Sequence, residues 1–195
     1  TATSWRRLFQ GTSEAKQAVT YAGGRFVTVG QTTDPITRAT LAPVQVSTDG
    51  ISWTRANDNP AFLPLTAVAY GQSRYVAVGP SSAIFTSADG RDWTRRTVPF
   101  TAAFSSIAAG LSLYVAGSSG STLYTSPDGT AWNSRAFAPN FAFRGAAYGN
   151  GRYVVVGDSD RSGGRCAERV GRVFREGDGH GLVGLDGRVI NGSDG

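Results

Sequence analysis

A seven-residue phrase that recurs three times constrains the fold of this chain more than any other feature. Its copies share the pattern S-x-D-G-x-x-W and lie at Ser47–Trp53, Ser87–Trp93 and Ser126–Trp132. Asp-Gly between two strand-like runs predicts a tight β-hairpin, because glycine tolerates positive φ and aspartate accepts bonds from nearby amides. The serine hydroxyl can add a local bond, and the tryptophan ring can cover the turn. The residues assigned to these turns are Ser47, Asp49, Gly50, Trp53, Ser87, Asp89, Gly90, Trp93, Ser126, Asp128, Gly129 and Trp132.

A second motif precedes each phrase and shows that the phrase belongs to a longer repeat. Its glycines Gly71, Gly110 and Gly149 are 39 positions apart, and the aspartates of the phrase move by 40 and then 39 positions. A fixed period in this range is typical of stacked supersecondary units. β-Branched and aromatic runs bounded by turn residues predict four short strands per unit. In the second unit these strands are Leu65–Tyr70, Tyr75–Val78, Ala83–Thr86 and Trp93–Thr97.

Four antiparallel strands in each unit of about 40 residues are typical of a propeller blade. No amphipathic helix is apparent in residues 17–157. We therefore expect an all-β fold, a partial β-propeller built from four-stranded antiparallel blades of 39–40 residues.

The phrase resembles the Asp-box, also called the BNR repeat, of the sialidase-like β-propellers. The resemblance covers roughly residues 5–157. In that family the box forms the turn between the third and fourth strands of a blade, which is where the predicted strands put it here. The family's boxes lie away from its active sites, so the resemblance implies a fold and says little about activity.

The repeat divides the chain into two parts. Residues 1–157 hold three complete units and parts of two more, and Trp5 matches the end of a unit, so we expect the chain to begin inside a repeat. Residues 158–195 contain one aromatic residue against 20 in the first 157, and 10 of their 38 residues are glycine. A disordered last blade, a flexible extension and an out-of-frame translation remain open. We favour the last, because the composition changes abruptly in mid-blade, and the coding DNA tests it.

Candidate catalytic groups are few. His180 is the only histidine and has no suitably placed serine or cysteine, which argues against a His-dependent triad and a zinc site. The single Cys166 excludes an intrachain disulfide. Sialidases use an arginine triad, an Asp acid/base and a Tyr–Glu pair, but Glu14 is the only glutamate of the repeat region and no residue can be carried over. We assign no catalytic residue and no cofactor.

One short motif suggests a metal. Asp158 and Asp160 match the opening half of a calcium loop, but Arg169 stands where the bidentate acid is needed. A polar turn explains this segment better, so we assign no metal site. Gly179–Gly184 fits G-x-G-x-x-G but lacks the βαβ context that a dinucleotide site needs.

Charge and hydropathy limit the partners. The net charge is +5, but the basic residues are scattered, and we expect no nucleic-acid partner. No apolar run of about 18 residues predicts a membrane span. Gly-, Ser-, Thr- and Trp-rich repeats of this kind resemble exported bacterial proteins, which implies a secreted, periplasmic or cell-surface location.

Antiparallel order predicts two different faces. The turns between first and second and between third and fourth strands share one end, with the recurrent Arg25, Arg74 and Arg152, which we interpret as solvating the rim. The remaining loops lie opposite, and loops on a rigid scaffold commonly carry binding. We expect Phe104 and Phe143 to pack between blades. The candidate ligand-binding residues are Asp34, Arg38, Asn57, Asp58, Phe100, Asn140 and Phe141.

These observations favour a non-catalytic binding or structural module of an exported bacterial protein, with a carbohydrate or protein ligand on the loop face. The alternative is a fragment of a sialidase-like glycoside hydrolase, whose paired carboxylates would lie outside this chain. A third possibility is an assembly factor that docks on a membrane complex, as some Asp-box propellers do.

Overall fold

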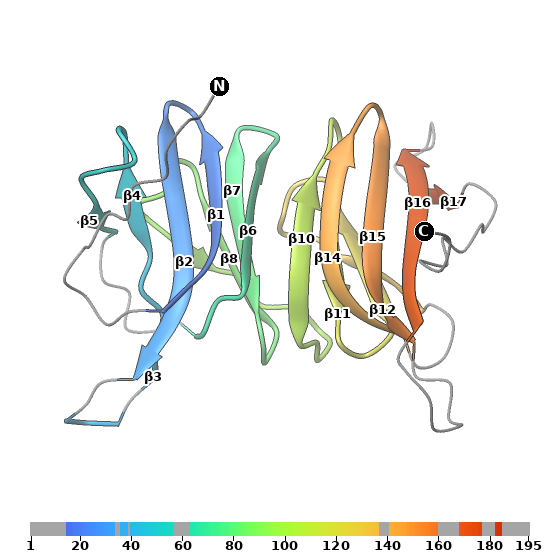
Figure 1. Cartoon of the computed structure of the whole chain (residues 1–195), viewed down its shortest axis with the longest axis horizontal. Helices are drawn as coiled ribbons and strands as arrows, with labels where there is room; N and C mark the ends of the chain where they lie inside the picture. The colour runs from blue at the N-terminus through green and yellow to red at the C-terminus, as the bar shows by residue number, and fades with distance from the viewer. Residues whose placement is uncertain are drawn as a thin grey trace, which may run out of the picture.

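The computed structural model describes residues 15–33, 36–38, 40–56, 63–136, 141–159, 168–176 and 182–184. Within these ranges every regular element is a β-strand, and the strands form four antiparallel sheets (Figure 1). The predicted all-β fold of four-stranded antiparallel sheets is therefore confirmed.

Three of the sheets correspond to the three complete repeats. The first contains β1 (Ala15–Ala22), β2 (Arg25–Thr33), β4 (Gln45–Ser47) and β5 (Thr54–Arg55), with β3 (Thr40–Leu41) paired to the end of β2. The second contains β6 (Ala67–Gly71), β7 (Arg74–Gly79), β8 (Ala83–Ser87) and β9 (Thr94–Arg95). The third contains β10 (Phe104–Ala109), β11 (Tyr114–Ser118), β12 (Thr122–Ser126) and β13 (Asn133–Ala136).

The fourth sheet combines the last repeat with part of the segment that follows it. It contains β14 (Phe141–Gly149), β15 (Arg152–Ser159), β16 (Glu168–Glu176) and β17 (Leu182–Gly184). The sequence pattern showed no third strand here, yet β16 pairs with β15 from Arg152 to Ser159. This strand holds Phe174, the one aromatic residue of residues 158–195, which pairs opposite Tyr153. The origin of residues 158–195 stays a prediction.

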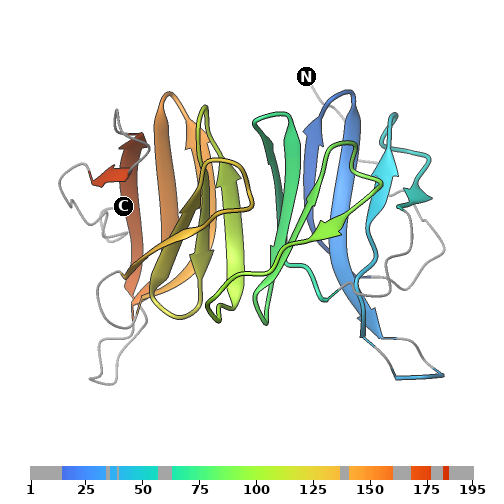
Figure 2. The ribbon, with the colours of Figure 1, turned by 180° about the vertical axis from the view of Figure 1, so that it is seen from behind.

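The sheets stand side by side with their first strands next to one another, so that β1 neighbours β6, β6 neighbours β10 and β10 neighbours β14 (Figures 1 and 2). The hairpins that join first and second strands all point to one end, at the top of Figure 1, whereas β3 lies at the opposite end. We call the end that also carries the S-x-D-G-x-x-W turns the box face, and the end with β3 the loop face.

The hydrophobic core lies between neighbouring sheets. Val27, Val46 and Phe85 belong to the cluster between the first two sheets. Phe104 is 2% exposed in the cluster between the second and third sheets, and Phe143 is 0% exposed between the third and fourth. Their predicted burial between blades is confirmed.

Buried tyrosines also tie each sheet to the one before it. The hydroxyl of Tyr75 donates to the carbonyl of Ala22, and that of Tyr153 donates to the carbonyl of Leu113 at 2.6 Å. The Tyr114 hydroxyl does the same to the β6–β7 hairpin, and burial raises its pKa to about 12. Each ring thus fills the interface while its hydroxyl keeps a partner.

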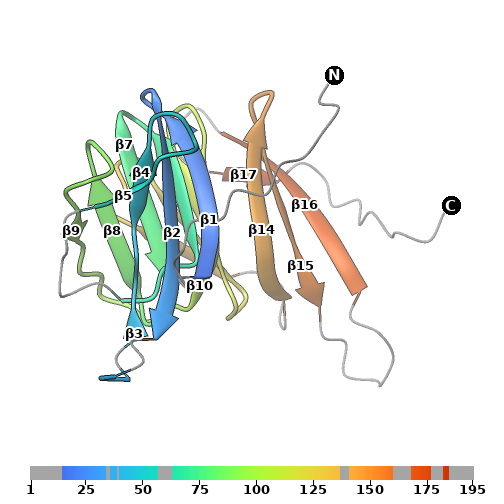
Figure 3. The same ribbon diagram turned by 60° about the vertical axis from the view of Figure 1, so that its left-hand side comes forward.

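The two outer sheets have one uncovered face each. Figure 1 shows them at opposite ends of the row, and in Figure 3 the first sheet is turned toward the viewer. The valine that follows the aromatic residue of the second strand is 0% exposed at Val27, Val76 and Val115, but 40% exposed at Val154. At the other end Val19 is 60% exposed. The sheets therefore form an open array that does not close on itself.

Candidate functional site

The three box turns carry the same hydrogen bonds. In the second turn the Asp89 carboxylate accepts bonds from the amides of Arg91 at 2.9 Å and Asp92 at 3.0 Å, and from the Ser87 hydroxyl at 3.0 Å. The Gly90 amide donates to the Ser87 hydroxyl, and the Trp93 indole donates to the Gly90 carbonyl. The turns at Asp49 and Asp128 repeat this arrangement.

These bonds hold the box aspartates in the ionised form. Amide bonds from Ser52 and Ile51 lower the pKa of Asp49 far below its usual range. Burial opposes the charge of Asp128, but bonds from Thr130 and Ala131 outweigh it and lower its pKa to about 2. Because each carboxylate is occupied inside its own turn, it is poorly placed to act on a ligand.

The box glycine has two reasons to be glycine. Its φ is +76° at Gly90 and +73° at Gly129, a region that favours a residue without Cβ. A Cβ at Gly90 would lie 2.8 Å from Val27 Cγ2, and one at Gly129 would lie 2.5 Å from Val76 Cγ2. The box turn therefore packs directly on the preceding sheet.

The recurrent arginines also join neighbouring sheets. Arg25 Nη1 donates to the carbonyl of Asp89 at 2.7 Å, and Arg74 Nη1 donates to the carbonyl of Asp128 at 3.2 Å. Each arginine thus reaches the box turn of the following sheet. Their position in the sequence predicts solvation of the rim and does not reveal this contact with the following sheet.

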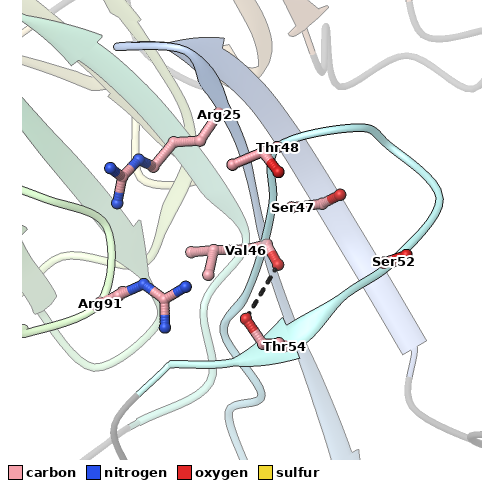
Figure 4. A pocket seen from close by; sticks show the side chains of 7 residues that line it. All are labelled: Arg25, Val46, Ser47, Thr48, Ser52, Thr54 and Arg91. Carbon is pink, nitrogen blue, oxygen red and sulfur yellow. Dashed lines mark hydrogen bonds between the residues drawn. The ribbon is translucent and has the colours of Figure 1, made fainter.

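The box face contains a cleft between the first two box turns. We call it the Arg25–Arg91 cleft, and its volume is about 250 Å³. Figure 4 shows the guanidinium groups of Arg25 and Arg91 pointing into the same space beside Val46. The lining residues are Arg25, Val46, Ser47, Thr48, Ser52, Thr54 and Arg91.

The loop face contains a second hollow, of about 370 Å³, which we call the threonine pocket. It forms where β3 pairs with the end of β2, which places Thr33 opposite Thr40. Its lining offers hydroxyl and amide groups and no ionisable side chain. The lining residues are Ala15, Gln31, Thr32, Thr33 and Thr40.

The predicted ligand-binding residues are dispersed. Arg38 is exposed, with a φ of +60°, in the insertion that carries β3. Phe100 is half-buried and stacks on Tyr124 with a centroid distance of 4.6 Å, between the second and third sheets. Phe141 begins β14. Four further candidates lie outside the described residues: Asp34, Asn57, Asp58 and Asn140.

The metal candidates give no cluster. Asp158 Oδ2 accepts a bond from Arg144 Nε at 2.8 Å, and Asp160 lies outside the described residues. In the part of the chain that the structure describes, no group of three or more His, Cys, Asp or Glu residues could hold a metal ion. The same part has no helix long and apolar enough to cross a membrane.

Two features escaped the sequence analysis. Gln31, Thr32, Thr33 and Thr40 were not among the predicted ligand-binding residues, although the Thr-rich insertion after Gly30 was the available signal. Arg91 was also missed, and its only signal is that it varies between repeats, since Thr130 occupies the same place in the third phrase.

No family model and no curated protein sequence matches this chain. Among solved structures it is similar to "YCF48 bound to D1 peptide", with a TM-score of 0.55, 17% identity, and coverage of 92% of this chain and 69% of that one. It is also similar to a member of the GH130 family of mannoside phosphorylases and glycoside hydrolases, with a TM-score of 0.56, 16% identity, and coverage of 84% and 67%. The computationally designed Ika8 protein matches with a TM-score of 0.58 and 13% identity over 93% of this chain and 52% of that one.

At such low identity these similarities define the fold alone. Together with the open array of four-stranded sheets, they show that the chain is part of a β-propeller.

Proposed function

We propose that the chain is an Asp-box β-propeller module of an exported bacterial protein, which binds a carbohydrate or protein ligand on its loop face without turning it over. The observation that carries the proposal is the threonine pocket. It lies on the connection between the predicted second and third strands of the first repeat, which among the described residues is the one that forms an additional strand, β3.

The chemistry of the pocket suits a neutral, hydrogen-bonding ligand. The hydroxyls of Thr32, Thr33 and Thr40 and the amide of Gln31 each donate and accept hydrogen bonds. Sugar hydroxyls and peptide groups need such partners. Hydrolysis of a glycoside ordinarily needs two carboxyl groups flanking the scissile bond, and the lining of the pocket has none.

The solved structures are compatible with either ligand. One similar protein has a peptide bound, according to its description, and another belongs to a family that acts on mannosides. The bound peptide and the action on mannosides are properties of those two proteins. Here they serve only to choose a peptide array and a glycan array as probes.

The test is a binding screen of the purified chain against a glycan array and a peptide array, with calorimetry on the hits. We expect binding that weakens about thirtyfold when Thr33→Val and Thr40→Val together remove two hydroxyls, since each net hydrogen bond contributes about 1 kcal/mol. Thr94→Val, which changes an exposed threonine of β9, is the matched control. Ligands that bind the double threonine variant as tightly as the wild-type chain would contradict the proposed site.

The sialidase-like hydrolase is tested in parallel with fluorogenic glycosides. Turnover of any of them by the purified chain would contradict a non-catalytic module, whereas binding without turnover would support it.

A further inference from the structure

The Arg25–Arg91 cleft places two cations from different sheets in one small space. Arg25 starts β2 of the first sheet, and Arg91 follows the box glycine of the second. Both side chains point into the cleft in Figure 4. Two guanidinium groups in one cleft repel each other unless an anion lies between them.

The first of these cations is held in place. Arg25 Nη1 donates to the carbonyl of Asp89 at 2.7 Å, which fixes the guanidinium and leaves its other donors for a ligand. In the part of the chain that the structure describes, the Arg91 guanidinium makes no hydrogen bond or ion pair with protein groups. One fixed and one uncommitted guanidinium therefore face the same volume.

The residues that line the cleft include no carboxylate. Asp49 accepts bonds from the amides of Ile51 and Ser52, and Asp89 accepts bonds from the amides of Arg91 and Asp92. Neither carboxylate lines the cleft, whereas the exposed hydroxyl groups of Thr48 and Ser52 do.

The third box turn shows that Arg91 is not required by the fold. Arg74 repeats the role of Arg25 there, with its bond to the carbonyl of Asp128. Thr130 stands at the place of Arg91, and its hydroxyl donates to the Asp128 carboxylate. The third box turn keeps its whole hydrogen-bond set without an arginine at this position.

We propose that the Arg25–Arg91 cleft is a binding site for a tetrahedral oxyanion, the sulfate or phosphate group of a small molecule. The planar guanidinium fork matches such groups with paired hydrogen bonds. A volume of about 250 Å³ accommodates one such group with a small substituent. The site lies on the box face, so it is separate from the ligand site proposed on the loop face.

The test follows the arginine Nε–Hε resonances of the full chain by nitrogen-15 NMR. The probes are sodium sulfate, sodium phosphate, glucose 6-sulfate and glucose 6-phosphate, each at ionic strength held constant with sodium chloride. We expect saturable shifts at Arg25 and Arg91 with the oxyanion probes and no saturable shift at Arg74. The esters and the inorganic ions together distinguish a sugar-borne group from a free ion.

Variants separate a built site from general attraction of anions. Arg91→Thr, which copies the third repeat, should weaken binding at least about tenfold, because a charge-assisted bond contributes about 1.5–3 kcal/mol. Arg91→Lys should retain part of the affinity. Arg135→Thr removes the same charge from the exposed strand β13 and should change nothing.

Arg91 is exposed, so Arg91→Thr is expected to fold, and unchanged amide resonances away from the cleft verify this. The proposal is overturned if no oxyanion probe gives a saturable shift at Arg25 and Arg91, or if Arg135→Thr weakens binding as much as Arg91→Thr does.

Discussion

The box face and the loop face differ in how far they repeat. On the box face three turns carry the same hydrogen bonds, including the bond from the tryptophan indole to the glycine carbonyl, and the same positive-φ glycine. On the loop face the connections between second and third strands differ in length, and among the described residues an additional strand, β3, occurs in the first sheet. The comparison teaches that repetition here marks what stabilises the sheet array, whereas departure from the repeat marks where a ligand can be recognised.

The largest expected effect comes from adding a side chain to a box glycine. Gly129→Val should lower the free energy of unfolding by about 3 kcal/mol or more, because it combines a strained backbone with overpacking. A Cβ there would lie 2.5 Å from Val76 Cγ2. Urea denaturation measures the loss.

Gly24→Val is the matched control for this substitution. Gly24 has the same φ of +73°, but nothing lies within 4 Å of its added Cβ. Gly24→Val should lower the free energy of unfolding only through backbone strain at positive φ, by about 1–2 kcal/mol. Equal losses at the two glycines would contradict the packing of box turns on the preceding sheet.

Two equivalent valines test whether the second strand is buried where a neighbouring sheet covers it and exposed where none does. Val76 is 0% exposed and Val154 is 40% exposed, although both follow the aromatic residue of a second strand. Val76→Ala should cost about 2 kcal/mol through lost burial and a residual cavity. Val154→Ala should stay within about 0.5 kcal/mol. Urea denaturation measures both losses in the free energy of unfolding. Equal losses would show that the outer face of the fourth sheet is covered in solution.

The box aspartates predict a smaller, pH-dependent effect. The pKa of Asp128 falls from 3.8 to about 2 on folding, so the folded state favours its charged form. The stabilisation is complete above the unfolded pKa and is lost as the pH falls from about 4 through about 2. Asp128→Asn should flatten this part of the profile of unfolding midpoint against pH. If Asp128→Asn lost stability between about pH 4 and about pH 2 as steeply as the wild-type chain, ionisation of Asp128 would not be the cause.

The smallest effect on stability is expected on the loop face. Thr33→Val and Thr40→Val change exposed side chains and should shift the free energy of unfolding by no more than about 0.5 kcal/mol. Thermal or urea unfolding checks this. A loss comparable to that of a box substitution would show that the threonine pocket supports the fold, and would remove the contrast between the two faces.

Most of the fold could be predicted from the sequence because the same local chemistry occurs three times. Asp-Gly turns, alternating strands and a fixed period gave β6 and β8 to within two residues of Ala67–Gly71 and Ala83–Ser87. Strand β16 could not be predicted, because its apolar residues Val170, Val173 and Phe174 do not alternate and no S-x-D-G-x-x-W phrase follows it.

The candidate sites were less predictable for a different reason. The threonine pocket depends on the register of β3 on β2, which places Thr33 opposite Thr40. The contact of Arg25 with Asp89 joins residues 64 positions apart, and it depends on how two sheets stack. Neither the register of an insertion nor the stacking of sheets is visible in a single strand.

The most direct test of the central claim compares the two faces in one calorimetric binding experiment with a hit from the glycan or peptide array. The wild-type chain, Thr33→Val with Thr40→Val, and the box-face variant Arg91→Thr are titrated under the same conditions. We predict that a neutral ligand loses about thirtyfold in affinity with the double threonine variant and keeps its affinity with Arg91→Thr. The opposite pattern would contradict a ligand site on the loop face.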